Sequence, residues 1–277
     1  MSPPGAAPRP TSAVSSGPVP TSAVPTGTAP TSTAPTTPAS SPTPSRSPTP
    51  PAPRPCAKPA SGFVRVAPGR GKTVALTFDD GPGRADAAIV EVLDRYGIHA
   101  TFFETGAHAA ASPATVKLLA SHGELIGDHG WEHQYPSRVA GGWTPGYLRR
   151  QFQRTNSELR RLTGQPVCFV RPPGGFRQNV LAAAAPLRMT AALWSVDSLD
   201  WRQPSRTTKA ATAAIVARAT ATGGRRHPIV LMHSSKASHE PDRVVSSYRG
   251  NTVAALPAVI EWYRSHGYRF VTLAGKA

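Results

Sequence analysis

Two adjacent aspartates, Asp79 and Asp80, end an apolar run and are followed by a Gly-Pro turn. The run TVALTF (73–78) is typical of a buried strand. Neighbouring side chains of a strand point to opposite faces, so both carboxylates can share one site only where the strand ends. Two bare anions repel each other, and a bound divalent cation would remove that repulsion. This stretch therefore indicates a metal site.

The motif HGWEH supplies further metal ligands, because His129 and His133 are four residues apart. Gly130 favours a turn over a helix, and in a turn the two rings can still converge. Two imidazoles and one carboxylate, from either Asp79 or Asp80, leave coordination positions open, as a catalytic metal requires. The remaining aspartate then suits a general base for water activated by the metal.

Other polar residues follow later apolar runs and could complete a reaction site. Arg171 could keep the base ionised, His233 could protonate a leaving group, and Asp200 could pair with either of them. Together these groups predict a metal-assisted hydrolase of an acyl group. A glycosidase that uses the two adjacent aspartates as its carboxylate pair is the alternative of a different class.

Alternating strand and helix patterns must position these residues. Helical patterns cover 86–96, 113–123, 147–164 (capped by Thr144) and 251–267, between seven predicted strands at 73–78, 99–105, 124–129, 166–170, 190–196, 228–233 and 268–273. This alternation predicts an α/β fold with a parallel sheet, either a barrel or a doubly wound sheet. In both, chemistry collects at the carboxyl ends of the strands, where the polar residues above are found.

Five motifs in this order resemble the polysaccharide deacetylase family, which is carbohydrate esterase family 4 or the NodB-homology domain. They are TFDDGP (77–82), HGWEH (129–133), RPPGG (171–175), DSLDW (197–201) and LMH (231–233). The resemblance covers about residues 70–275. It implies a distorted (β/α) barrel with fewer than eight complete units, in agreement with about seven parallel strands.

The resemblance also implies roles for individual residues. Asp79 would be the catalytic base, oriented by Arg171, and His233 the acid, tuned by Asp200. One divalent metal, commonly zinc or cobalt, would be held by Asp80, His129 and His133. The substrate groove would be formed by Trp201 as a wall, Leu231 at the acetyl methyl group, Pro173 and Gly174.

Three positions depart from the family pattern. Gly130 stands where a Ser or Thr usually follows the first histidine, which removes a hydroxyl that could orient the ligands. Gly174 replaces an aromatic residue, and thus keeps the backbone amide of the oxyanion hole but loses a wall of the groove. Ser234 stands where many members have Asp. None of these changes touches the base, the metal ligands or the acid.

The remaining candidates have structural interpretations. His239 is interpreted as a loop residue, Trp194 as packing, and Asp197 as a brace for its loop. Asp128 and Glu132, which flank the ligand histidines, could be hydrogen-bond partners that support these ligands or solvated charges, and we favour the second interpretation.

The N-terminal composition differs from that of the rest of the chain. Residues 1–62 hold most of the prolines, 18 of 31 by residue 60, with many Thr and Ser. Such a segment cannot bury enough apolar surface to fold, so we expect a disordered linker or stalk before a catalytic domain at 63–277. The net charge of +16 favours an anionic partner. Without a nucleic-acid motif, we expect anionic cell-wall polymers rather than nucleic acid.

The stalk suits an exported protein. No run reaches the roughly 20 apolar residues of a membrane span, and residues 1–30 lack the apolar core of a signal peptide. We expect an extracellular or cell-wall-associated monomer. Cys56 and Cys168 either form one disulfide, which would tie the stalk to the domain, or are two free thiols.

The predicted activity is metal-dependent hydrolysis of acetyl groups on a polysaccharide. De-N-acetylation of N-acetylglucosamine in peptidoglycan or chitin-like chains is the leading substrate hypothesis. An O-acetyl esterase acting on acetylated xylan and an inactive carbohydrate-binding homologue are the alternatives.

Overall fold

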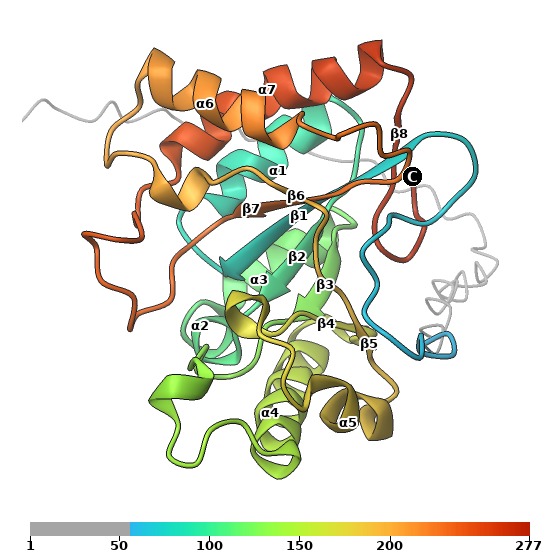
Figure 1. Cartoon of the computed structure of the whole chain (residues 1–277), viewed down its shortest axis with the longest axis vertical. Coiled ribbons are helices and arrows are strands. Elements are labelled where there is room, and N and C mark those ends of the chain that lie inside the picture. The colour runs from blue at the N-terminus through green and yellow to red at the C-terminus, as the bar shows by residue number, and fades with distance from the viewer. Residues whose placement is uncertain (1–55) are drawn as a thin grey trace, which may run out of the picture. The chain divides into compact units, whose positions relative to one another are not determined.

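A curled parallel sheet forms the centre of the domain, and helices cover its outer face (Figure 1). The computed structural model describes residues 56–277, so most of the segment 1–62 lies outside the described residues. The sheet order is β5-β4-β3-β2-β1-β7-β6, with β8 paired to β1, and all pairs are parallel. The strands are β1 (Thr73–Gly81), β2 (Thr101–Glu104), β3 (Leu125–Asp128), β4 (Phe169–Val170), β5 (Thr190–Ala191), β6 (Val196–Asp197), β7 (Ile229–His233) and β8 (Arg269–Phe270). The predicted α/β fold, a distorted barrel, is confirmed.

Seven α-helices lie in the described part of the chain. They are α1 (Asp86–Arg95), α2 (Gly106–Ala111), α3 (Pro113–Ser121), α4 (Pro145–Thr163), α5 (Val180–Ala184), α6 (Lys209–Ala219) and α7 (Gly250–Ser265). In α4, the Thr144 hydroxyl accepts the Tyr147 N–H, and Gly164 ends the helix in a left-handed conformation at φ 68°. Within residues 56–277, no helix is both long and apolar enough to cross a membrane.

Strand alternation divides the core into two layers. On β1, Val74, Leu76 and Phe78 belong to the large cluster that includes the apolar faces of the helices. Ala75 belongs to a smaller cluster on the inner side of the curl. Because side chains alternate along a strand, Asp79 points to the same inner side as Ala75. The pattern of β1 therefore directs the first aspartate into the barrel.

The predicted strand 190–196 is wrong as a single element. The structure divides it into β5 and β6, which lie at opposite edges of the sheet order. The intervening residues cross the gap between these edges, so they cannot pair with one neighbour throughout. Val64 fills part of this gap, because its N–H donates to Ala191 O at 2.9 Å and its carbonyl accepts the Leu193 N–H at 2.8 Å.

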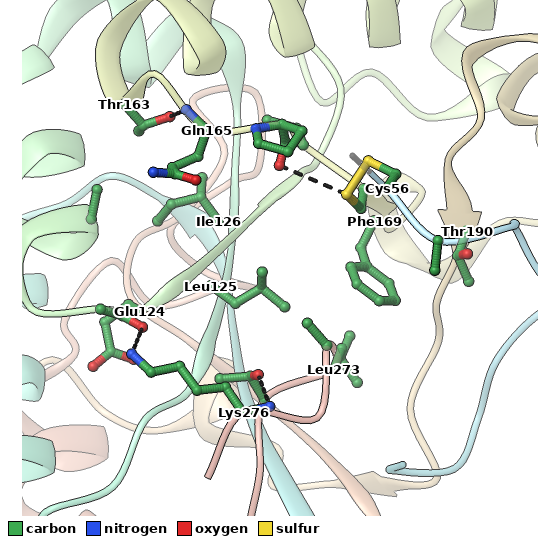
Figure 2. A pocket seen from close by; sticks show the side chains of 18 residues that line it. Cys56, Glu124, Leu125, Ile126, Thr163, Gln165, Phe169, Thr190, Leu273 and Lys276 are labelled. Carbon is green, nitrogen blue, oxygen red and sulfur yellow. Dashed lines mark hydrogen bonds between the residues drawn. A yellow bond between two sulfur atoms is a disulfide. The ribbon is translucent and has the colours of Figure 1, made fainter. Parts of the chain in front are cut away.

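A disulfide joins Cys56 to Cys168, which are 112 residues apart (Figure 2). Of the two alternatives for these cysteines, the structure has the bonded one. Cys168 directly precedes β4, so the bond lies at the amino end of the sheet, away from the aspartates. It borders a cavity of about 850 Å³ with apolar walls that include Leu125, Phe169 and Leu273.

Candidate active site

The two aspartates face one site because β1 is irregular at its end. The register between β1 and β2 shifts between Asp79 and Gly81, and Asp80 adopts a left-handed backbone at φ 71°. This extra residue turns the Asp80 side chain towards the face on which Asp79 already lies. Aspartate is one of the few residues other than glycine that tolerate this conformation.

Asp80, His129 and His133 form a buried cluster that could hold a metal ion. One potential ligand atom from each lies within 4.8 Å of the others. Nε2 of His133 is 3.1 Å and Nε2 of His129 is 3.4 Å from Asp80 Oδ1. Asp80 Oδ1 is buried and has no hydrogen-bond partner among the described residues. A carboxylate and two imidazoles converging on one point fit a divalent cation such as zinc.

The turn after β3 orients the first histidine. The N–H at His129 Nδ1 donates a hydrogen bond to the carbonyl oxygen of Arg171 at 2.7 Å. This places the proton on Nδ1 and leaves Nε2, which faces Asp80, free to bind a metal. Gly130 has φ 78°, which suits glycine, and its N–H donates to Asp128 Oδ1 at 2.7 Å. Asp128 is fully buried, so its interpretation as a solvated charge is wrong. Glu132 is exposed, as expected.

Arg171 is in direct contact with Asp79. Its Nη1 donates to Asp79 Oδ1 at 2.7 Å and to Thr77 Oγ1 at 2.8 Å, and the guanidinium is fully buried. It also lies over the ring of Phe103, 4.2 Å from the centroid. Burial lowers the pKa of Arg171, and the neighbouring Asp79 opposes that shift. The pair places a fixed positive charge beside the carboxylate that would act as the base.

His233 and Asp200 form a second ion pair. The Asp200 carboxylate accepts from His233 Nδ1 at 2.8 Å, from the His233 backbone N–H at 2.9 Å and from Thr252 Oγ1 at 2.8 Å. Burial acts to lower the pKa of His233, but the charge of Asp200 and the hydrogen bond to it raise that pKa to about 9. His233 is therefore protonated at neutral pH.

A pocket of about 270 Å³ opens above these groups. It is bordered by the three metal-ligand candidates Asp80, His129 and His133, by the acid candidate His233, and by Trp201, Leu231 and Gly174. Asp79, Arg171 and Asp200 are buried and do not border this pocket themselves. Pro173 is buried and borders a neighbouring small cavity beside Gly130 instead.

The comparisons with known proteins agree with this arrangement. A model of the family described as polysaccharide deacetylase matches residues 67–192. A chitooligosaccharide deacetylase from Sinorhizobium fredii is 30% identical over 74% of this chain and 94% of its own length. The chain belongs to the polysaccharide deacetylase family. A peptidoglycan-N-acetylglucosamine deacetylase from Bacillus cereus is 33% identical over 72% of this chain.

Solved structures show the same deacetylase fold. One is a peptidoglycan N-acetylglucosamine deacetylase in complex with 4-naphthalen-1-yl-N-oxidanyl-benzamide, which is 29% identical with a TM-score of 0.64 and covers 77% of this chain and 92% of that chain. Another is a mutant, with restored enzymatic activity, of a pseudoenzyme of the same carbohydrate esterase family, at 25% identity and a TM-score of 0.64, covering 78% and 71%. This chain spans 66% of the length of the Bacillus cereus relative and 38% of a Listeria monocytogenes relative.

Two aromatic residues occupy the space left by Gly174 in this member of the polysaccharide deacetylase family. Gly174 has φ 59°, and a Cβ atom there would lie 2.9 Å from Tyr135 Cε1 and 3.0 Å from Phe176 Cε2. Both rings border the pocket. The wall that an aromatic at position 174 would provide is thus supplied by neighbouring segments, which explains why glycine is accommodated there.

Sequence reasoning missed one wall of the pocket. The Tyr135 hydroxyl donates to Glu240, and the His239 ring lies 5.5 Å from the His133 ring, centroid to centroid. Trp194, interpreted as packing, also borders the pocket. Tyr135, His239 and Glu240 belong to loops without hydrophobic periodicity, so no sequence signal placed them beside the metal ligands.

A further buried acid, Glu104, ends β2 next to the bulge. Both of its carboxylate oxygens lack hydrogen-bond partners among the described residues. Burial, together with the charges of Asp86, Asp79 and Asp80, holds the pKa of Glu104 well above its usual range, which favours the neutral acid. A Cβ atom at Gly81 would lie 2.6 Å from Glu104 Oε2, so only glycine leaves room for this side chain.

Proposed function

We propose that this chain is a metal-dependent de-N-acetylase acting on N-acetylglucosamine residues of peptidoglycan or a chitin-like chain. The observation that carries the proposal is the convergence of three devices at one pocket. They are a carboxylate paired with a buried arginine, an Asp-His-His cluster, and a histidine that is protonated at neutral pH. The named activities of the relatives support deacetylation of such glycans.

Asp80, His129 and His133 would hold the cation. Zinc is the metal that this donor set suits best, and cobalt is a second candidate. When bound, the cation supplies Lewis-acid polarisation of the acetyl carbonyl. The protein's part is to aim both imidazoles inward, as the hydrogen bond from His129 to the Arg171 carbonyl does for one of them.

Asp79 would take a proton from the attacking water. Its carboxylate is 3% exposed, and its Oδ1 is fixed by Arg171, which leaves Oδ2 for the reaction. The buried guanidinium fixes the orientation of this carboxylate. The backbone N–H at Gly174, at the edge of the pocket, is a donor for the oxygen that becomes negative during attack.

His233 would give its proton to the departing nitrogen. An amine is a poor leaving group unless it is protonated, and the pKa of about 9 keeps His233 charged until the proton is needed. An O-acetyl ester has a weaker need for such an acid. The Asp200–His233 pair therefore favours N-acetyl over O-acetyl substrates, including acetylated xylan.

The setting of the domain supports a cell-wall substrate. Relatives of this chain are named peptidoglycan deacetylases, and the Pro-rich N-terminal composition and the disulfide at Cys56 suit an extracellular or wall-associated enzyme. We propose this location, with the domain at 63–277 as the catalytic unit, and a monomeric state.

The test is acetate release from a panel of N-acetylated glycans and O-acetylated xylan, with zinc, with cobalt and with chelator. We expect acetate from N-acetylated glycans, loss of activity with chelator, and loss in Asp79→Asn. Glu132→Gln, which changes an exposed acid near the same site, is the matched control. Reducing ends that form in chelator would indicate a glycosidase, and glycan binding without acetate an inactive homologue. Either result would overturn the proposal.

A further inference from the structure

A second cavity, of about 1230 Å³, lies beside the active-site pocket. It is bordered by the segment after β1, the segment after β7 and the start of α7. Ser234, which borders it, directly follows His233, and Pro82 lies two residues after Asp80. His108 also borders it, and its Nδ1 donates to the Asp80 carbonyl oxygen at 2.8 Å. This second cavity therefore lies next to the segments that carry Asp80 and His233.

The charged residues bordering this cavity are basic. They include Arg84, Lys236 and Arg249, with His108 as a titratable neighbour, and no acidic residue. Lys236 already pairs with Asp242, at 2.9 Å. Arg84 forms no ion pair with another described residue. Of the three cations, Arg84 and Arg249 thus form no ion pair within 4 Å among the described residues.

Arg249 is the central group. It is 3% exposed and its Nε donates to the Ser235 carbonyl at 2.8 Å, whereas Nη1 and Nη2 have no partner among residues 56–277. Leaving two donors of a buried cation unpaired is costly, because neither water nor an acceptor replaces the lost hydration. The side chain is therefore prepared for an acceptor that comes from outside the folded chain.

The neighbouring groups do not supply that acceptor. The Ser234 hydroxyl belongs to a residue that is 1% exposed, has no partner among the described residues, and is neutral. The charge of Arg249 acts on the buried carboxylate of Asp200, but both oxygens of Asp200 already accept hydrogen bonds from His233 and Thr252. In addition, α7 begins at Gly250 with no side-chain cap and no acidic residue in its first turn, so its positive end also lacks a partner within residues 56–277.

We propose that this cavity binds a carboxylate carried by a sugar residue of the acetylated glycan, with Arg249 as the main contact and Arg84 at the rim. A guanidinium with two free nitrogens matches a carboxylate in a paired hydrogen-bond geometry. The inference rests on the proposed function, and it makes the substrate an acidic acetylated glycan rather than a neutral one. Arg249 is a specificity-determining residue on this view.

The test compares a peptidoglycan glycan strand, freed of peptides, with the same strand after its carboxylates are reduced to alcohols. Affinity is measured by calorimetry and kcat/KM by acetate release, for wild type, Arg249→Gln, Arg249→Lys and Arg84→Gln. Arg218→Gln, which removes an exposed charge from α6, is the matched control. Circular dichroism checks that every variant is folded.

We expect wild type to bind the acidic strand about tenfold or more tightly than the reduced strand, the usual scale for hydrogen bonds to a charged group. Arg249→Gln should abolish that ratio, and Arg249→Lys and Arg84→Gln should reduce it. Ser234→Asp keeps Arg249 but supplies an internal carboxylate, and should abolish the ratio as well. Equal affinity of wild type for both strands, or an unchanged ratio in folded Arg249→Gln, overturns the inference.

The two proposals fail separately. Acetate release from both strands with equal affinity would leave the deacetylase in place and remove the acidic subsite. A preference for the acidic strand in the binding measurement, without acetate from any glycan, would keep the subsite and remove the proposed reaction.

Discussion

Replacing Asp200 by Asn should move the pH dependence of the reaction in a defined direction. In the native chain, Asp200 accepts two hydrogen bonds from His233, one from the ring and one from the backbone. The asparagine side chain would keep the size of the carboxylate and lose its charge. Since burial lowers the pKa of His233 and Asp200 is the main group that outweighs it, the pKa should fall from about 9 to below the ordinary 6.5.

The size of the effect follows from these values. With a pKa of about 9, His233 is about 97% protonated at pH 7.5, whereas below 6.5 no more than about a tenth is protonated. A reaction that needs the charged ring should therefore lose about tenfold in kcat/KM at pH 7.5. At pH 5.5 the loss should be smaller. The charge of Asp80 also raises the pKa of His233, by less than Asp200 does, and a cation bound at Asp80 would offset this contribution.

Stability provides a second readout of the same pair. A pKa raised on folding contributes free energy of unfolding that is fully present below about pH 6.5 and is lost as pH rises through about 9. The difference corresponds to about 3 kcal/mol. Urea unfolding at pH 6 should show most of this loss in Asp200→Asn, and at pH 9.5 much less.

The decisive assay is the pH profile of kcat/KM on one N-acetylated oligosaccharide. The alkaline limb should move down by about two pH units or more in Asp200→Asn. It should not move down in Thr252→Val, which keeps the charge of the Asp200 carboxylate, or in Asp94→Asn. An alkaline limb that stays in place in Asp200→Asn would show that His233 is not the acid, and would refute the reasoning.

Three further outcomes are expected. Asp80→Asn should lower zinc affinity by more than about 10–100-fold, which is the range typical of changes to residues that only support the ligands. The control Asp197→Asn should bind zinc like wild type. Metal content after dialysis measures both, and equal content in the two variants would contradict the ligand set. Gly81→Ala should lower the free energy of unfolding by about 1–3 kcal/mol, because its Cβ would lie 2.6 Å from Glu104 Oε2. Gly62→Ala is the control, since a Cβ at Gly62 meets nothing within 4 Å. Denaturant unfolding compares the two variants, and equal losses would contradict the crowding argument. Cys168→Ser should cost about 2–5 kcal/mol by releasing a loop of 112 residues, and reducing agent should then have no further effect on Tm.

The sequence indicated which residues would gather at the candidate site, but not the surfaces around them. Ligand types and strand ends indicated His129 and His133 with one of the two adjacent aspartates, and the choice of Asp80 came from the family resemblance. The rotation of the Asp80 side chain towards the site could not be predicted from the sequence, because the bulge depends on how β1 pairs with β2. The burial of Asp128 was missed for a similar reason, since only the folded turn shows its bond to the Gly130 N–H.

The elements missed by sequence reasoning share a physical cause. Tyr135 and Glu240 meet across the pocket although they are 105 residues apart, and their loops are positioned by tertiary contacts rather than by local propensity. The segment 190–196 has the pattern of one apolar strand, but its ends pair with strands at opposite edges of the sheet. Hydrophobic pattern alone does not encode which neighbour a short run will find.

The pairing of β1 with β7 links the chemistry to folding. Asp79 and His233 are directly opposite each other in this parallel ladder, although 154 residues separate them along the chain. Such a non-local pairing requires closure of a long loop and belongs to the slow class of folding events. A slip of one residue would turn one of the two side chains to the other face of the sheet. Acetate release during refolding should therefore report when this pairing reaches its native register, after spectroscopic signals from the helices are complete.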